Sequence, residues 1–157
     1  MSPDRAVRDR HDFLAGIERE LTLLGRHQVL PGSTREPGVL EKSAYLLLTR
    51  LEAQQPMSLR ELADAFRLDV STVNRQVAAL LRQGLAERIP DPDGGLARKL
   101  RPTAEGARKL REDREHYRRR LGLVVTGWSE ADRHAFYELL LRFNSGIEVL
   151  QGTHWPR

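Results

Sequence analysis

Apolar residues recur three and four positions apart along most of the chain, a spacing typical of amphipathic helices. This spacing predicts a first helix from His11 to about Leu30, which Pro31-Gly32 ends. Residues 1–10 are polar, and we expect them to be frayed. A second helix is predicted over residues 40–51, ahead of the segment Gln54-Gln55-Pro56 that closes it.

Two short helices joined by a tight turn follow. Ser58 with Glu61 three residues later is a capping box, and it starts a helix that runs through Phe66. Residues 67–69 form the turn, in which Leu68 is expected to fill the joint between the two helices. The next helix is predicted to begin near Val70 and to be capped by Gly84. Its inward positions are Val73, Val77, Leu80 and Leu81.

The pattern then changes to the alternation of a β-hairpin. A strand is predicted over residues 85–89 and a basic strand over 96–101, with PDPDGG as the turn between them and Pro102 as the breaker. Two short helices, a tight turn and a hairpin in this order are typical of a winged helix-turn-helix. The predicted fold class is therefore mainly α with a small β-hairpin wing (α+β).

Long amphipathic helices flank this unit. Thr103 is expected to cap one of them, and Ser129 with Asp132 caps the last, which Gly152 ends. Their apolar stripes exceed what the small unit can cover, which favours a two-fold homodimer over a monomer with the helices folded onto its own core. The chain is thus divided into an N-terminal dimerisation helix and loop, a winged helix-turn-helix and C-terminal dimerisation helices, at residues 1–38, 39–102 and 103–157.

Composition agrees with a globular protein and favours a polyanionic partner. The net charge is +4, with 26 basic and 22 acidic residues interspersed, so a solvated mixed-charge surface accounts for most of it. No apolar run approaches the roughly 18 residues of a membrane span, and the N-terminus lacks the apolar core of a signal peptide. We therefore expect a cytoplasmic location. The absence of cysteine excludes disulfides and thiolate sites.

The helix beginning near Val70 carries side chains suited to reading DNA. With its apolar positions facing inward, the outward positions are Ser71, Thr72, Asn74, Arg75 and Gln76. Arginine can donate twice to guanine, Gln or Asn can pair with adenine, and the threonine methyl can contact thymine. A serine at the helix start can bond phosphate. The alternative interpretation is an ordinary solvated helix face, but the neighbouring capped helix and hairpin favour DNA contact.

The hairpin adds a second group of candidate DNA contacts, namely Arg88, Arg98, Lys99 and Arg101. Arg98 is best placed to reach a narrow minor groove. Lys99 and Arg101 are expected to bind phosphate. Each such contact adds roughly 0.9 to the slope of log affinity against log salt. The alternative is that these cations only solubilise a sheet edge.

Other chemistry is poorly represented. None of the five histidines falls in a recognised metal motif, and Glu112 with His116 is the spacing of an ordinary surface helix pair. The chain has no serine-hydrolase signature, phosphate loop or paired carboxylates, so neither catalysis nor a cofactor or metal is expected.

The segments YLLLTRL, SLRELA, DVSTVNRQVAALLRQGLAER, DPDGG and TAEG resemble the multiple antibiotic resistance regulator (MarR) family, with the resemblance extending from about His11 to Leu150. The resemblance implies a homodimeric winged-helix transcription factor. It implies a repressor that leaves a palindromic operator in double-stranded DNA when a small phenolic or lipophilic ligand binds. It also places Thr72, Arg75 and Gln76 on the recognition helix and Arg98 in the wing.

Two departures from the family's pattern concern the wing. The family's Asp-x-Arg at the wing tip corresponds to Asp93-Gly94-Gly95, so the tip arginine is missing, and Arg98 is the candidate to replace it. The family's Leu-Thr before the long helix is Pro102-Thr103.

The family's ligand sites lie between the dimer helices and the DNA-reading unit. Four polar or aromatic residues could line such a cleft, namely Glu20, His27, Tyr45 and Trp128. The alternative is that Tyr45 and Trp128 are core aromatics and His27 is a surface residue. For the whole chain, the competing hypothesis is a winged-helix protein-interaction module without specific DNA binding.

Overall fold

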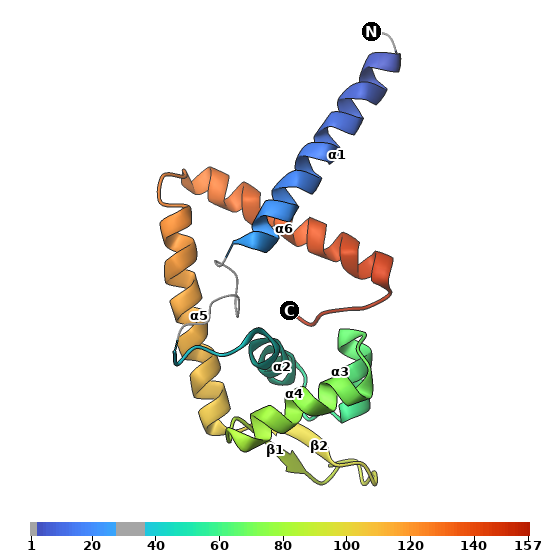
Figure 1. Cartoon of the computed structure of the whole chain (residues 1–157), viewed down its shortest axis with the longest axis vertical. Coiled ribbons are helices and arrows are strands. Elements are labelled where there is room, and N and C mark those ends of the chain that lie inside the picture. Colours follow the sequence, from blue (N-terminus) through green and yellow to red (C-terminus); the bar gives the residue numbers. More distant parts are fainter. Residues whose placement is uncertain (1–2, 28–36) are drawn as a thin grey trace.

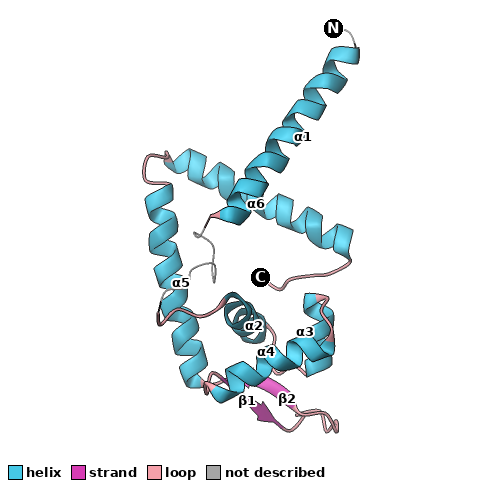
Figure 2. Ribbon diagram, in the orientation of Figure 1, coloured by secondary structure: helices cyan, strands magenta, loops and turns pink. Residues whose placement is uncertain are grey.

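The computed structural model describes residues 3–27 and 37–157. One long helix precedes a compact unit of three shorter helices and a hairpin, and two long helices follow it. Figures 1 and 2 show this arrangement. The elements are α1 (Pro3–Arg26), α2 (Lys42–Ala53), α3 (Leu59–Phe66), α4 (Val70–Arg82), β1 (Ala86–Ile89), β2 (Lys99–Pro102), α5 (Ala104–Val124) and α6 (Glu130–Gln151). The predicted class, helical with one small hairpin, is confirmed.

The prediction for the start of the chain was wrong. Helix α1 begins at Pro3, not near His11, so most of the polar residues expected to fray are helical. Proline is well tolerated in a first helical turn, because its missing N–H would have no partner there. The predicted end at Leu30 and the breaker Pro31-Gly32 lie outside the described residues.

The core lies between α2, α4, β2 and the first half of α5. Leu48 and Leu51 of α2 are fully buried, as the helical spacing predicted. They pack in one apolar cluster with the inward residues of the other elements, namely Leu62, Val73, Val77, Leu80, Leu100 and Leu110. Helix α5 therefore belongs to this core through Leu110, although the sequence division began a separate part at residue 103.

The helix-turn-helix agrees with the sequence except at its turn. Ser58 Oγ accepts a hydrogen bond from the Glu61 N–H (3.2 Å), and Glu61 Oε2 accepts one from the Ser58 N–H (2.6 Å), which confirms the capping box. Leu68, however, is 43% exposed and does not fill the joint. The buried apolar side chains of α3 and α4 instead include Leu62, Ala63 and Val73.

The wing is an antiparallel hairpin that pairs Ala86 with Pro102 and Ile89 with Lys99. On its other edge, β2 exchanges two backbone hydrogen bonds with Met57, through Leu100. The predicted second strand began too early, because residues 96–98 lie outside β2. Pro102 belongs to the strand as its last residue, so the strand ends one residue later than predicted.

Helices α1 and α6 expose their apolar faces. Helix α6 buries no residue, and its Phe136, Leu139 and Phe143 are 43–59% exposed. In α1, Phe13 and Leu14 are 75% and 66% exposed. In the described residues, these faces therefore do not cover the chain's own core, contrary to what the monomer alternative expected.

The chain end returns to the winged helix, which no sequence pattern indicated. After α6, Trp155 packs edge to face on Phe66 of α3, with ring centroids 5.6 Å apart. The buried Arg50 of α2 donates to the His154 carbonyl oxygen (3.3 Å) and lies over the Trp155 ring. Burial lowers the pKa of Arg50. The tail thus connects α6 with both α2 and α3.

Candidate nucleic-acid interface

Helix α4 presents a polar face away from the core. Ser71, Asn74 and Arg75 are exposed, and Thr72 is half-buried. The Arg75 guanidinium lies 3.5 Å from Thr72 Oγ1, a long contact that leaves it available to a ligand. Arg82, seven residues after Arg75, is also exposed, and this two-turn spacing would have identified it from the sequence as a further candidate.

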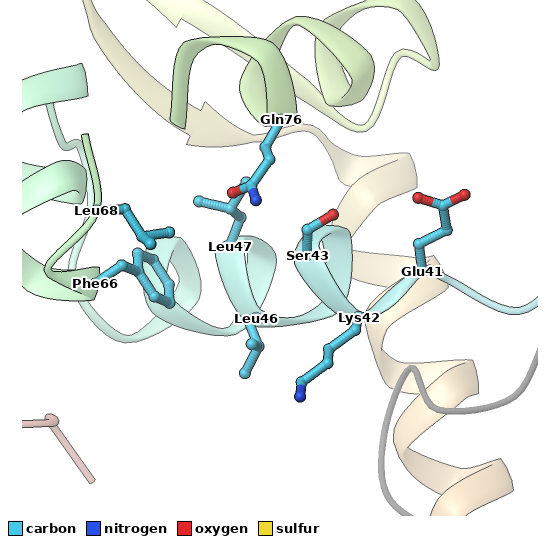
Figure 3. A pocket seen from close by; sticks show the side chains of 8 residues that line it. All are labelled: Glu41, Lys42, Ser43, Leu46, Leu47, Phe66, Leu68 and Gln76. Carbon is cyan, nitrogen blue, oxygen red and sulfur yellow. The ribbon is translucent and has the colours of Figure 1, made fainter. Parts of the chain in front are cut away.

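Gln76 does not share this outward face. Its side chain is half-buried and extends toward Leu47 and Ser43 of α2, as Figure 3 shows. The reason is angular: position 76 lies one residue before the buried Val77 and three after the buried Val73, at the edge of the core face. The prediction that Gln76 points outward was wrong for this conformation.

The wing cations fall into two groups. Arg88 and Arg98 are exposed, and among the described residues neither has an ion-pair partner within 4.0 Å. Arg101 Nε instead pairs with Glu87 Oε1 across the hairpin at 2.7 Å. Lys99 Nζ lies 3.3 Å from Asp91 Oδ1, and its side chain is only 15% exposed. The hydrogen bond to Asp91 raises the pKa of Lys99. The four cations are therefore not equally free to contact DNA.

The wing turn is organised by Asp91. Its Oδ1 accepts a hydrogen bond from the Asp93 N–H (3.1 Å), and its carbonyl oxygen accepts one from the Gly94 N–H (3.0 Å). Gly94 has φ +81°, in the left-handed region that favours glycine. A Cβ at Gly95 would lie 2.3 Å from Asp91 Oδ2. A side chain at position 95, arginine included, would displace this carboxylate.

The residues suggested for ligand binding are not brought together in one chain. Glu20 is exposed on α1, and His27, just after the end of that helix, is also exposed. Tyr45 packs edge to face on Tyr117 with centroids 5.6 Å apart, and Trp128 packs on Phe136 at 5.4 Å. Three pockets lie in the described part of the chain, and none of these four residues is part of their lining.

Two of these pockets adjoin each other beside α4. One, of about 420 Å³, lies between α2, the α3–α4 turn and Gln76 (Figure 3). The other, of about 380 Å³, lies between the segment before α2, α4 and Lys109. They share Glu41, Ser43 and Gln76. The third, of about 430 Å³, lies between α3, α6 and the chain end.

Within residues 3–27 and 37–157, no cluster of three or more acidic or histidine side chains is arranged to hold a metal ion. Of the helices that the structure describes, none combines the length and apolar character of a bilayer span.

This chain is a winged helix-turn-helix protein. Its capped helix α3 is followed by a turn at Arg67, by α4 with the exposed Arg75, and by a hairpin beside them. The MarR family model matches residues 40–94. Over 132 residues the chain is 39% identical to YxaD, an HTH-type transcriptional regulator of Bacillus subtilis (strain 168), covering 83% of this chain and 92% of that protein. The chain belongs to the MarR family and is a DNA-binding transcriptional regulator.

Further relatives agree. YybA, an HTH-type transcriptional regulator of the same organism, is 27% identical over 112 residues, which are 69% of this chain and 73% of that protein. A solved MarR family protein from Bacillus stearothermophilus matches 94% of this chain and 99% of its own, with a TM-score of 0.67 and 24% identity. The match to the apo form of wild-type MarR from E. coli covers 82% of this chain and 95% of that one, with a TM-score of 0.66 and 14% identity. These two structures support the fold.

Proposed function

We propose that this protein is a cytoplasmic, homodimeric repressor that binds a palindromic operator through α4 and releases it when a small phenolic or lipophilic ligand binds. The observation that carries the proposal is the exposed face of α4, with Arg75 and Ser71 on it and the wing beside it. A helix presented in this way fits the major groove, and two copies related by a two-fold axis read two half-sites.

The apolar faces of α1 and α6 support the dimer. An unpaired helix with side chains such as Phe143 and Leu139 exposed is unfavourable in water, and a second copy of the same surface would cover it. The relatives are named only as regulators or MarR family proteins, so the two-fold assembly is our inference from this surface.

The paired pockets beside α4 support release by a ligand. A molecule seated between α2 and Gln76 would contact both the core and the recognition helix. It would release DNA only if it bound the DNA-free arrangement of these helices more tightly than the bound one. We expect salicylate, as a small phenolic probe, to weaken operator binding in the same titration that tests α4.

The test is binding of wild type and Arg75→Ala to DNA from upstream of the gene, at physiological salt. Loss of the two donors of Arg75 should weaken specific binding by about 1–3 kcal/mol. Arg142→Ala is the matched control, because Arg142 is an exposed arginine of α6, a helix outside the winged helix. Equal affinity of wild type and Arg75→Ala would refute the recognition helix, and sequence-blind binding by wild type would refute the repressor.

A further inference from the structure

We propose that Asp91 and Lys99 form an internal ion pair that holds the wing in its DNA-binding conformation. Lys99 then acts as a positioning residue for Arg98 and does not contact a phosphate itself. This inference rests on the proposed function, since it assumes that the wing lies against DNA. It replaces the expectation that Lys99 is a phosphate ligand.

The contacts of Lys99 all lie within the protein. Its Nζ is 3.3 Å from Asp91 Oδ1 and 3.8 Å from Asp93 Oδ2. The side chains of Lys99 and Asp91 are 15% and 12% exposed, whereas Asp93 is 88% exposed. Glu61 in the first turn of α3 adds a further favourable charge. An ammonium group in this setting would lose these partners to reach a phosphate.

Asp91 and Lys99 stand at the two ends of the wing loop. Asp91 follows β1 and Lys99 begins β2, so their ion pair closes the segment between them. The same Asp91 carboxylate accepts a hydrogen bond from the Asp93 N–H. Because Gly95 has no side chain, the Asp91 carboxylate can occupy the space beside it. Arg98 immediately precedes Lys99 and is exposed. Fixing the loop ends lowers the entropy that Arg98 loses on binding DNA.

The pair between Arg101 and Glu87 offers a contrast within the same hairpin. Both side chains are about half exposed, at 50% and 45%, and neither anchors a turn. Glu87→Gln therefore removes one carboxylate from the wing without loosening the loop, and it serves as the matched control for Asp91→Asn.

The first experiment compares these two variants in operator binding by fluorescence anisotropy. DNA repels carboxylates, so losing an acidic residue from a wing should strengthen binding or leave it unchanged. We expect this result for Glu87→Gln. If Asp91 holds the wing, Asp91→Asn should instead weaken binding about fivefold, the effect of one lost DNA contact. Unchanged or tighter binding by Asp91→Asn would overturn the proposal.

The second experiment places Lys99→Met in an Arg98→Ala background. In this background Lys99 has no Arg98 side chain left to position. The second substitution should therefore change the affinity by no more than about twofold and leave the slope of log affinity against log salt unchanged. A phosphate ligand would act independently of Arg98, and its loss would lower the slope of log affinity against log salt by a further ~0.9. That additional loss of slope would overturn the proposal.

Folding and the proposed function are controlled separately. Thermal unfolding identifies any variant that fails to fold. In that case Gly95→Ala gives the answer, because it displaces the Asp91 carboxylate while keeping every charge, and it should also weaken operator binding. If Arg75→Ala weakens binding but Asp91→Asn and Gly95→Ala do not, only the wing proposal fails. If wild type shows no specific binding, the proposed function fails.

Discussion

Gly106 shows how one residue sets the position of a helix. A Cβ there would lie 1.9 Å from the Leu85 carbonyl oxygen, which is a backbone atom and cannot move aside. The Thr103 N–H donates to that same oxygen (3.1 Å), and Thr103 Oγ1 donates to the Gly84 carbonyl oxygen (2.6 Å). The start of α5 is thus held against the chain just before β1. The sequence showed the threonine cap, but the contact that requires glycine comes from packing.

We expect Gly106→Ala to destabilise the protein by about 2–3 kcal/mol, because the added methyl group forces α5 away from Leu85. For a chain of this size that corresponds to a fall in Tm of roughly 5–10 °C, measured by calorimetry. Gly122→Ala in the same helix is the control. Nothing lies within 4 Å of its Cβ position, so helix propensity should make that change neutral or slightly stabilising. An equal Tm for Gly106→Ala and wild type would contradict the packing argument.

At the scale of elements, the helix caps agree with the sequence prediction, whereas the start of β2 does not. The capping box of α3 and the caps at Thr103 and Ser129 each involve residues three positions apart, so the sequence contains the whole interaction. The start of β2 depends instead on pairing with β1, whose paired residues lie ten or more positions earlier. Lys99 is the first residue whose partner, Ile89, is in register.

The capping box makes α3 sensitive to acid. Its hydrogen bond from the Ser58 N–H holds the pKa of Glu61 below its usual value. The stabilisation is therefore complete above the unfolded pKa, near 4.3, and is lost as pH falls through the lower folded pKa. Ser58→Ala should cost about 1 kcal/mol at pH 7, measured by urea unfolding.

The pH dependence is tested with Glu61→Gln, because Ser58→Ala keeps the backbone N–H that the carboxylate binds. Glu61→Gln retains an acceptor for the Ser58 N–H but cannot titrate. The cost of Glu61→Gln should be largest near pH 7 and should shrink between pH 5 and pH 3, as the wild-type carboxylate protonates, whereas the cost of Ser58→Ala should depend less on pH. A cost of Glu61→Gln that stayed constant over this range would contradict the role given to the carboxylate.

At the scale of the whole molecule, one chain leaves the apolar faces of its outer helices exposed. The apolar face of α6, which includes Phe136, Leu139 and Phe143, has no cover in one chain, and the described part of α1 is also exposed. The winged helix, in contrast, has a closed core. In the proposed dimer, reading two half-sites requires the outer helices, while reading one half-site requires only the core unit.

Phe143→Glu should therefore shift the protein from dimer to monomer in sedimentation, since a charge in an apolar interface loses its hydration. Affinity for a palindromic operator should fall by at least tenfold, with half-site binding little changed. His134→Glu is the matched control, because it introduces the same charge on the opposite face of α6, by helical angle. An unchanged dimer in Phe143→Glu would show that this face is not the interface.

The sequence by itself determined the helices, their caps, the order of a winged helix-turn-helix and the exposed apolar faces, because each depends on residues within a few positions of one another. Tertiary structure decided which polar side chains are free. Lys99 is held by Asp91, Gln76 is turned toward α2, and Arg50 is joined to the chain end through His154. These outcomes depend on which distant segments fold against each other, and hydrophobic periodicity does not encode such pairings.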